Sequence, residues 1–447
     1  MSQAALACSS VTEKFEKEFS TSRKLHEQAS ELFPHGVTHD LRYLTPFPIY
    51  VDRAEGAYKW DVDGHQLIDF WAGHGALLLG HSHPEVVSAV QKQMAKATHP
   101  GACHELEVEW GQWVQRLIPS AERMRFVSSG TEATLMALRL CRIATGKPKV
   151  LKFAGHFHGW HDFVLPACDL PYRGAQTPGI PRHFEPVIVR PNDPDAVEQA
   201  LANDPEIGCV IIEPTGGHFG QVPVRGPFLT ALREITEKHR RLLIFDEVIT
   251  GFRVHPNGAQ GHYGIKPDLT TMAKILAGGL PGGCVAGRAD ILDFLTFRPG
   301  QPKMKHPGTF NANPLSAAAG TTTLRLVSTG EPCRRANELG QRMRRQLNEW
   351  FARRNLNWVA YGEFSGVKLL PNYDGPRPDD DTFIPYDGDP DRLEPEKNVP
   401  FIHAFRQALL LNGVDMPGLA GMTMSAHSEE DIDRAVDAIG SAIEMLK

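Results

Sequence analysis

One lysine of the chain has a setting that suits covalent chemistry. Lys274 follows the largely apolar segment 269–273 and precedes Ile275, Leu276 and a glycine pair at 278–279. An amine in an enclosed apolar setting is disfavoured in its charged form, so its pKa falls and it becomes nucleophilic. Such an amine can react with an aldehyde, although most lysines are solvated surface residues.

Two further features supply polar groups at the ends of predicted strands. Asp246 ends the apolar run 242–245, where a carboxylate can pair with a protonated ring nitrogen; a strand-end cap or salt bridge is the other interpretation. Ser129, Gly130 and Thr131 stand between a predicted strand and a predicted helix, so backbone N–H groups at the helix start can bind an anion. A plain helix N-cap explains the same three residues equally well.

The segment 154–161 combines an aromatic ring with three histidines. Phe157, at its centre, could stack on a planar ligand. The His-x-His-x-x-His spacing has no partnering cysteine or carboxylate pattern, so it is weak evidence for zinc, and we predict no metal site.

The order of predicted elements around these residues indicates an α/β fold. Helices are predicted at 84–97, 105–117, 132–145, 192–203, 225–239 and 313–327, and strands at 124–128, 149–153, 208–212, 241–245 and 282–286. This alternation predicts a mostly parallel sheet covered by helices. Ligands of such sheets bind outside the carboxyl ends of the strands, which is where the residues above fall.

Three segments are expected along the chain. Residues 1–83 form an N-terminal segment that packs with the small domain, with a helix over 11–33 and a hairpin over 57–70 turned at Asp63-Gly64. Residues 84–330 form the large domain, and residues 331–447 a smaller α+β domain. The elements expected in the small domain are helices at 331–354, 399–412 and 429–446, strands at 357–361 and 364–370, and a Pro-, Asp- and Gly-rich loop at 371–397.

The composition favours a soluble protein that handles small molecules. Of its 447 residues, 41% are hydrophobic and 22% charged, as is usual for globular proteins. The net charge of −6, without a basic run, argues against nucleic-acid and membrane partners. The seven scattered cysteines form no C-x-x-C pair and the N-terminus lacks a secretory pattern, so a cytoplasmic location is expected.

Taken together, the amine, the acid, the aromatic ring and the anion site match the chemical groups of pyridoxal 5′-phosphate. Their order, with Glu213-Pro214 before Asp246 and Gly308-Thr309-Phe310 after Lys274, resembles class III aminotransferases of fold-type I from about residue 34 to the C-terminus. The resemblance implies that Lys274 forms the internal aldimine and moves the substrate proton, while Asp246 keeps the pyridine nitrogen protonated. The other cofactor-binding residues that it implies are Ser129, Gly130 and Thr131 at the phosphate, Val248 and Phe157 on the two ring faces, His158 and Glu213, and Thr309 at the phosphate of the neighbouring subunit in a symmetric homodimer.

Within this family, residues 34–42 resemble the matching segment of glutamate-1-semialdehyde aminomutases, which implies that the Arg42 guanidinium binds the substrate carboxylate. Two positions depart from the mutase pattern: His74 stands where a tryptophan is expected, and Leu419 where an acidic residue is expected. The segments 72–76, 155–163, 217–220 and 356–362 are similar to the stereo-inverting D-phenylglycine (D-4-hydroxyphenylglycine) aminotransferases. That similarity implies that His74 and His218 surround the substrate together with Arg42.

The main prediction from the sequence is therefore an aminotransferase. It would move an amino group from an amino acid, with a D-arylglycine as one candidate, to a 2-oxo acid such as 2-oxoglutarate. The alternative is a glutamate-1-semialdehyde 2,1-aminomutase, an isomerase that uses the same site. A more remote alternative is a non-catalytic binding module that keeps the fold.

Overall fold

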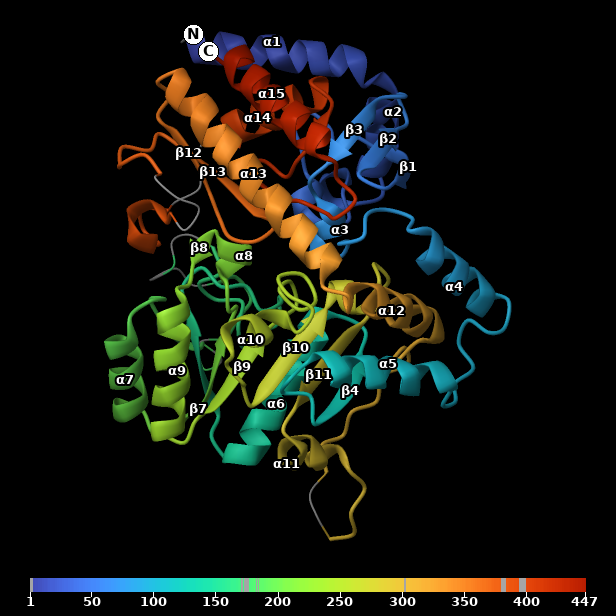
Figure 1. Ribbon diagram of the computed structural model, residues 1–447, viewed down its shortest axis with the longest axis vertical. Coiled ribbons are helices and arrows are strands. Elements are labelled where there is room, and N and C mark those ends of the chain that lie inside the picture. Colours follow the sequence, from blue (N-terminus) through green and yellow to red (C-terminus); the bar gives the residue numbers. More distant parts are fainter. Residues whose placement is uncertain are drawn as a thin grey trace.

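The computed structural model describes residues 3–169, 172, 177–181, 183, 185–300, 303–378, 383–393 and 399–447, and of residues 3–7 the backbone alone. These residues form an upper and a lower lobe in the view of Figure 1, with the two chain ends close together at the top. The loop predicted over 371–397 lies outside the described residues at 379–382 and 394–397. No helix of the described chain is both long enough and apolar enough to cross a membrane.

The lower lobe is built on one large sheet. Its strands are β4 (Arg123–Val127), β5 (Lys149–Phe153), β6 (Val187–Val189), β7 (Ile207–Ile212), β9 (Leu242–Asp246), β10 (Leu269–Ala273) and β11 (Gly283–Gly287). Their order is β4-β11-β10-β9-β7-β5-β6, and neighbours run parallel except that β11 is antiparallel to both β10 and β4. The mostly parallel α/β sheet expected from the sequence is thus confirmed, whereas β10 and β6 were not predicted as strands.

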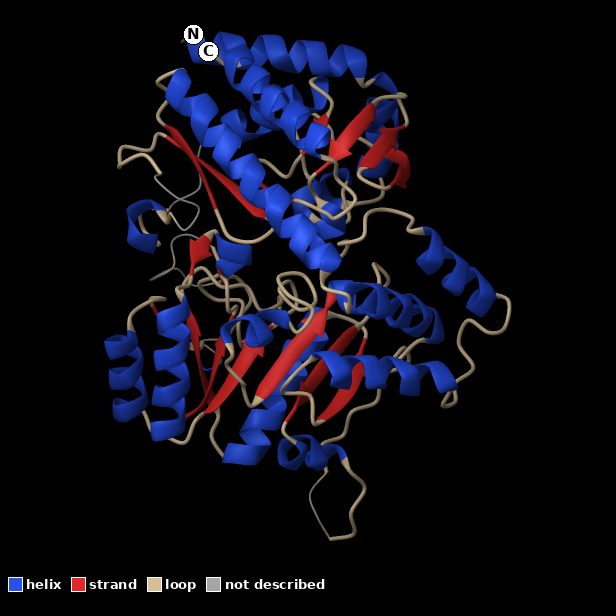
Figure 2. Cartoon of the chain, viewed as in Figure 1, coloured by secondary structure: helices blue, strands red, loops and turns tan. Residues whose placement is uncertain are grey.

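Helices cover both faces of this sheet (Figure 2). They are α5 (Glu105–Leu117), α6 (Gly130–Thr145), α7 (Pro194–Asn203), α9 (Gly226–Lys238), α10 (Gly258–Tyr263), α11 (Ala289–Leu292) and α12 (Pro314–Val327). In β7, Cys209 and Ile211 join the core cluster that contains α6, while Val210 and Ile212 join the cluster that contains α7 and α9. Because successive side chains of a strand point to opposite faces, a strand that is apolar throughout requires cover on both sides.

The upper lobe combines the start and the end of the chain. Its helices are α1 (Gln3–Glu18), α2 (Ser20–Ser30), α13 (Glu331–Arg353), α14 (Val399–Leu411) and α15 (Glu429–Met445). Its strands are β1 (Val51–Glu55), β2 (Tyr58–Asp61), β3 (Gln66–Asp69), β12 (Trp358–Tyr361), β13 (Gly366–Pro371), β14 (Val414–Asp415) and β15 (Ala420–Met422). They form two sheets, β1-β2-β3-β14 and β12-β13-β15, and β14 pairs with β3 in parallel. The hairpin predicted over 57–70 is confirmed, since β2 and β3 are antiparallel around Asp63-Gly64.

The helix predicted over 11–33 is wrong in its extent. The structure has two helices there, α1 and α2, and the chain leaves helical geometry between them at Phe19, with φ −106° and ψ 48°. The Phe19 ring is buried and stacks on Phe15 with a centroid distance of 4.6 Å. The charged, helix-favouring residues around Phe19 do not reveal this break.

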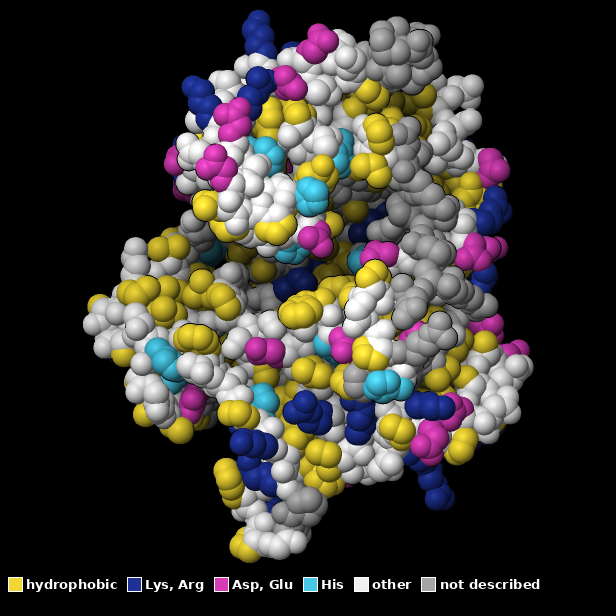
Figure 3. Space-filling view, turned by 180° about the vertical axis from the view of Figure 1, so that it is seen from behind, with side chains coloured by type: hydrophobic (Ala, Val, Ile, Leu, Met, Phe, Trp, Pro, Cys, Tyr) yellow, Lys and Arg dark blue, Asp and Glu magenta, His cyan; other side chains and the backbone are white. Residues whose placement is uncertain are grey.

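The carboxyl ends of the parallel strands lie at one edge of the large sheet, beneath the upper lobe (Figure 1). Strand β9 ends with Asp246, and β7, β10 and β5 lead directly into Glu213, Lys274 and the loop 154–161. The remaining short elements are η1 (Pro34–Gly36), η2 (Asp40–Arg42), α3 (Ala72–Gly75), α4 (Pro84–Met94), α8 (Gly217–Gly220), β8 (Val222–Pro223), η4 (Lys274–Ala277), η5 (Asp293–Leu295) and η6 (Pro385–Gly388). Seen from behind, the surface is hollowed between the lobes, with Lys, Arg and His side chains in and around the hollow (Figure 3).

Candidate active site

Lys274 lines a cavity of about 170 Å³ at the carboxyl edge of the large sheet. Its backbone has a φ of +56°, a left-handed conformation that L-residues rarely adopt, so the chain turns sharply as it leaves β10. Burial lowers the pKa of its amine, opposed by the nearby carboxyl groups of Asp246 and Glu213. The structure therefore gives Lys274 the setting that a nucleophilic amine requires.

Asp246 lines the same cavity from the neighbouring strand β9 and is buried. Its Oδ1 accepts hydrogen bonds from the backbone N of Val248 and from Oγ1 of Thr271, both at 3.1 Å. Its Oδ2 lies 2.7 Å from Nδ1 of His158. These contacts hold the carboxylate in one orientation toward the cavity.

His158 is buried behind Asp246. Because Nδ1 faces a carboxylate oxygen, it carries the proton, and burial lowers the pKa of the ring, so the neutral form is favoured. The backbone oxygen of His158 accepts a hydrogen bond of 2.6 Å from Oγ1 of Thr134, one turn into α6. This bond ties the 154–161 loop to the helix that begins the proposed anion site.

Helix α6 begins at Gly130, and Ser129 caps it by accepting a hydrogen bond from the backbone N of Glu132. The first N–H groups of a helix have no intrahelical partner, and they open here beside Gly130 and Thr131, which line the cavity. A Cβ atom at Gly130 would lie 3.0 Å from Cγ1 of Val248, so the absence of a side chain allows Val248 to pack against the helix start. The geometry suits a phosphate at the helix N-terminus and an apolar ring face against Val248.

Glu213 connects two backbone segments on another side of the cavity. Its Oε1 accepts hydrogen bonds from the backbone N of Phe157 at 2.8 Å and of His218 at 3.2 Å. Burial, and then the charge of Asp246, raise the pKa of Glu213 to about 8. The Phe157 ring is 41% exposed and stacks with His218 at a centroid distance of 6.0 Å. Glu213 therefore positions two of the predicted ligand-contacting residues at once.

The three histidines of the 154–161 loop contact different groups. Nδ1 of His156 accepts a hydrogen bond from the backbone N of Glu213, and Nε2 of His161 lies 3.1 Å from Oγ1 of Thr134, whereas His158 pairs with Asp246. Within the described residues, no group of three or more His, Cys, Asp or Glu side chains has an arrangement that could hold a metal ion.

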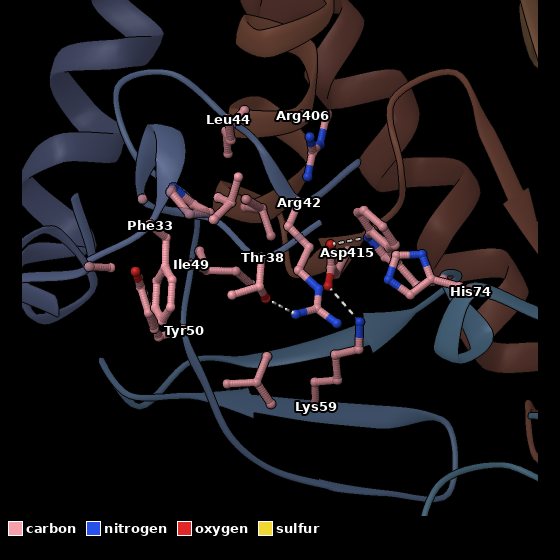
Figure 4. Close-up of a pocket in the computed structure, with 17 residues that line it drawn as sticks. Phe33, Thr38, Arg42, Leu44, Ile49, Tyr50, Lys59, His74, Arg406 and Asp415 are labelled. Atoms are coloured by element: carbon pink, nitrogen blue, oxygen red, sulfur yellow. Dashed lines mark hydrogen bonds and ion pairs between the residues drawn. The ribbon is translucent and has the colours of Figure 1, made fainter. Parts of the chain in front are cut away.

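Arg42 and His74 line a second cavity, of about 380 Å³, between the N-terminal segment and α14 (Figure 4). The Arg42 side chain extends into this cavity, and its Nη1 donates to Oγ1 of Thr38 at 2.9 Å. At the cavity wall, Nζ of Lys59 lies 2.8 Å from Oδ2 of Asp415, so that lysine is already neutralised. Arg42 is not paired with a carboxylate in this way, whereas Arg406, which also lines the cavity, donates to the backbone oxygens of Leu41 and Tyr43.

His74 connects the two cavities electrostatically. Its ring stacks on His39 with a centroid distance of 4.6 Å. Burial, and then the positive charges of His39, Arg42 and Lys274, lower the pKa of His74 to about 4. His74 is therefore a neutral imidazole near Lys274, and its stacking partner His39 is a residue that the sequence did not suggest.

Two further singled-out residues, Thr309 and Leu419, line neither of these cavities. Thr309 is exposed on a turn and is not among the residues that line the cavity of its own chain. Leu419 packs against the upper-lobe core, which fits its apolar side chain in place of an acidic one.

Sequence reasoning missed two buried cations near the site, Lys152 and Arg253. Nζ of Lys152 donates to the carbonyl oxygens of His156, Val164 and Pro166 at 2.6–2.8 Å, so it holds the loop that carries Phe157 and His158. A signal was available for Lys152, because it interrupts the apolar strand sequence Val-Leu-Lys-Phe. Nothing in the sequence around Arg253 distinguishes it from a surface arginine.

Comparisons with known proteins agree with this geometry. A family model described as Aminotransferase class-III matches residues 42–371. The chain is 41% identical over 358 residues to a glutamate-1-semialdehyde 2,1-aminomutase of Methanothrix thermoacetophila, covering 78% of this chain and 82% of that protein. Among solved structures, it is similar to a glutamate-1-semialdehyde aminomutase of Pseudomonas aeruginosa PAO1, with 25% identity, a TM-score of 0.86 and coverage of 99% and 98%. It is also similar to an omega-transaminase of Sphaerobacter thermophilus, with 31% identity, a TM-score of 0.86 and coverage of 95% and 97%.

These relatives contradict the main functional prediction from the sequence. The curated relatives at 35–41% identity are glutamate-1-semialdehyde 2,1-aminomutases, which move an amino group within one molecule rather than between two. The prediction of transfer from an amino acid such as a D-arylglycine to a separate 2-oxo acid was therefore wrong. It gave two departures from the mutase pattern, His74 and Leu419, and four short segments more weight than the similarity along the rest of the chain.

Proposed function

The chain belongs to the class III aminotransferase family, and we propose on this basis that it is a glutamate-1-semialdehyde 2,1-aminomutase. The observation that carries the proposal is the similarity to aminomutases along most of the chain, supported by a cavity that brings Lys274 and Asp246 together. The reaction exchanges the amino group on C2 with the oxygen on C1. The product is thus 5-amino-4-oxopentanoate, with no net oxidation and no second substrate.

Pyridoxal 5′-phosphate is the cofactor of this enzyme, and the residues of the Lys274 cavity fit it. Lys274 would hold its aldehyde carbon, Asp246 its ring nitrogen, and the start of α6 at Ser129, Gly130 and Thr131 its phosphate. Val248 and Phe157 would contact the two faces of the ring. When bound, the cofactor stabilises negative charge that develops on the substrate carbon.

Lys274 has two tasks in the proposed reaction. It would hold the cofactor through its amine, and once the substrate amine has taken its place the free amine would move protons between the substrate carbons and the cofactor. Burial favours the neutral amine, which is the form that can accept a proton. Asp246 would balance the positive charge of a protonated ring nitrogen, and the hydrogen bonds from Val248 and Thr271 keep its carboxylate in place.

Arg42, His74 and His218 are the proposed substrate-binding residues. A guanidinium fork binds a carboxylate through two parallel hydrogen bonds, and the donors of Arg42 face a cavity next to His74. Neutral imidazoles at His74 and His218 can donate or accept hydrogen bonds without adding charge. This arrangement fits a substrate that carries one carboxylate remote from the reacting carbons.

We also propose that the active unit is a symmetric homodimer. Thr309 is exposed and next to Phe310, whose side chain is 59% exposed. In a dimer, Thr309 would reach the cofactor phosphate of the partner subunit, which explains its distance from the cavity of its own chain. Sedimentation at several protein concentrations tests this proposal, and a monomer at all concentrations contradicts it.

Supplying glutamate-1-semialdehyde alone tests the proposed activity. The purified, cofactor-loaded protein should form 5-amino-4-oxopentanoate through many turnovers in the absence of any 2-oxo acid. An aminotransferase would stop after one turnover per site under these conditions, because its cofactor would remain in the amine form. Turnover that depends on an added 2-oxo acid would therefore contradict the proposal.

A further inference from the structure

Arg253 is a buried cation that the proposed reaction does not use. It lies in the turn after β9, and its side chain is fully buried. Its guanidinium donates hydrogen bonds to uncharged oxygens. Because a buried charge is costly without a carboxylate partner, a guanidinium kept here calls for an explanation.

The guanidinium joins segments from three parts of the chain. Its Nη2 donates to the backbone oxygens of Gly75 and Leu77 at 3.1 and 3.0 Å. Its Nη1 donates to Oγ of Ser365 and to the backbone oxygen of Thr423 at 3.2 and 3.3 Å. Ser365 and Thr423 are themselves buried, and the backbone N of Thr423 donates to the oxygen of Ser365. Arg253 therefore connects the turn after β9 to both the α3 segment and the C-terminal part of the upper lobe.

One of these segments lies beside the side chain of Lys274, and a second packs against the first. A Cβ atom placed on Gly75 would lie 3.7 Å from Cδ of Lys274 and 3.4 Å from Sδ of Met422. Gly75 is thus in contact range of the lysine stem, and Met422 directly precedes Thr423. Arg253 therefore holds the backbone of Gly75, which lies beside the Lys274 stem, and the backbone of Thr423, whose neighbour Met422 packs against Gly75.

We propose that Arg253 is a positioning residue for Lys274. Its guanidinium fixes the Gly75 and Met422–Thr423 segments as a rigid wall, and this wall keeps the Lys274 amine directed at the reacting carbon. The planar fork of arginine can span acceptors on three segments at once, whereas the point-like ammonium of a lysine cannot. The proposal rests on Lys274 being the cofactor-bearing residue of the proposed function.

The positive charge of Arg253 also favours the neutral form of the Lys274 amine. Burial is the larger cause that lowers the pKa of Lys274, and the Arg253 charge adds to it. The other titratable groups that face Lys274 are Asp246 of β9, Glu213 after β7, and His74 and His39 from the N-terminal segment. Removing the Arg253 charge should therefore make the free lysine amine easier to protonate.

Two substitutions separate position from charge. Arg253→Lys can keep the charge but cannot bridge all the acceptors, so kcat should fall about tenfold or more with KM within about threefold. Arg253→Met removes both, so kcat should fall further. Peptide mass spectrometry of the apoprotein can follow the acylation of Lys274 as a function of pH. The pH midpoint of this acylation should rise by about one unit in Arg253→Met and should not change in Arg253→Lys.

Arg344→Lys is the matched control. Arg344 is also buried and donates to backbone oxygens, those of Phe364 and Gly366. It should lower the free energy of unfolding without moving the Lys274 acylation midpoint. If Arg253→Met folds and retains both the wild-type kcat and the wild-type acylation midpoint, the proposal is wrong. If Arg253→Met does not fold, a wild-type kcat in Arg253→Lys overturns the proposal. The acylation measurement needs no substrate, so it remains decisive even if the proposed aminomutase reaction is not observed.

Discussion

The Nδ1 atom of His158 lies 2.7 Å from Oδ2 of Asp246, and both side chains are buried. The histidine is held from its other side, because its backbone oxygen accepts a hydrogen bond from Thr134 of α6. The acid at the end of β9 is thereby connected to the helix that begins the anion site. We expect that a displacement of the Asp246 carboxylate would also displace the start of α6, and the reverse.

Replacing Asp246 tests the role of its charge. Asp246→Asn keeps the size of the side chain but removes the negative charge that would balance a protonated ring nitrogen. We expect kcat to fall by roughly 10²–10³-fold, as is typical when one preorganised electrostatic partner is lost. Steady-state kinetics check this, and a pH titration of cofactor absorbance should show a lowered pKa for the ring nitrogen. A variant with wild-type kinetics would falsify the assignment.

Replacing Lys274 removes the proposed proton carrier. Lys274→Ala should retain the fold but lose turnover by at least about 10²–10⁴-fold, the usual contribution of a general acid–base residue. Borohydride should trap the cofactor covalently on the wild-type chain and leave it dialysable in the variant. Lys266→Ala is a control, because its Nζ pairs with Glu122 in an exposed ion pair. Covalent trapping in Lys274→Ala would show that another amine holds the cofactor.

Arg42→Ala should weaken substrate binding more than it slows the chemical step. A charged hydrogen bond is worth about 1.5–3 kcal/mol, so kcat/KM should fall by roughly 10–150-fold, mostly through KM. Arg42 is exposed in the free protein, so its replacement should leave the free energy of unfolding nearly unchanged. Kinetics together with thermal unfolding test both statements. Unchanged KM would place the carboxylate-binding residue elsewhere.

The raised pKa of Glu213 predicts a specific dependence of stability on pH. The folded protein holds a proton on Glu213 up to about pH 8, whereas the unfolded chain loses it near pH 4.5. Between these values the folded state binds the extra proton, so this group contributes less stability as the pH rises.

Glu213→Gln should abolish that contribution while keeping the hydrogen bonds to Oε1. The backbone N–H groups of Phe157 and His218 both reach this atom, which the amide oxygen can replace. The melting temperature of the variant relative to wild type should therefore increase from pH 5 to pH 8. A difference that is constant with pH, or that decreases, would mean that Glu213 is ionised in the folded protein.

Lys152→Met should destabilise the protein by about 3 kcal/mol or more. The substitution leaves three buried carbonyl oxygens without their donor, and each such group is costly. Lys149→Met, on the same strand but with an exposed ion pair to Asp204, should cost less than about 1 kcal/mol. Urea unfolding of the two apoproteins gives the comparison. Equal losses would show that Lys152 is not bonded as described.

The sequence allowed the alternating elements to be predicted because their signals are local. Asp63-Gly64 between two alternating runs marks the hairpin, and five of the large-sheet strands are short apolar runs. Strand β10 escaped notice because Thr270 and Thr271 interrupt its apolar pattern. In the structure both hydroxyl groups are buried and satisfied: Thr271 donates to Asp246, and Thr270 pairs with Ser120 and Gln260. A partner from elsewhere in the chain makes such residues compatible with a core, and the strand's own sequence does not reveal it.

The residues of the candidate site also divide into those that have a local signal in the sequence and those that do not. Asp246 and the 129–131 segment could be found because they lie at or just after the ends of predicted strands, which share one edge of the sheet, and Lys274 because it follows a largely apolar segment. Arg253, Lys152 and His39 could not be assigned roles, because each acts through contacts with segments distant in sequence. Arg42 and His74 were identified together, and the structure places them in a cavity next to that of Lys274 rather than in the same one.

The parallel pairing of β14 with β3 has a consequence for the newly made chain. The strand Gln66–Asp69 leaves the ribosome long before its neighbour Val414–Asp415 is translated. One edge of the sheet that contains β3 therefore stays unpaired until synthesis is nearly complete. The lower lobe, whose sequence lies between β3 and β14, can already fold during this time. A chaperone that shields exposed strand edges during translation should accordingly raise the yield of this protein more than one that acts only after release.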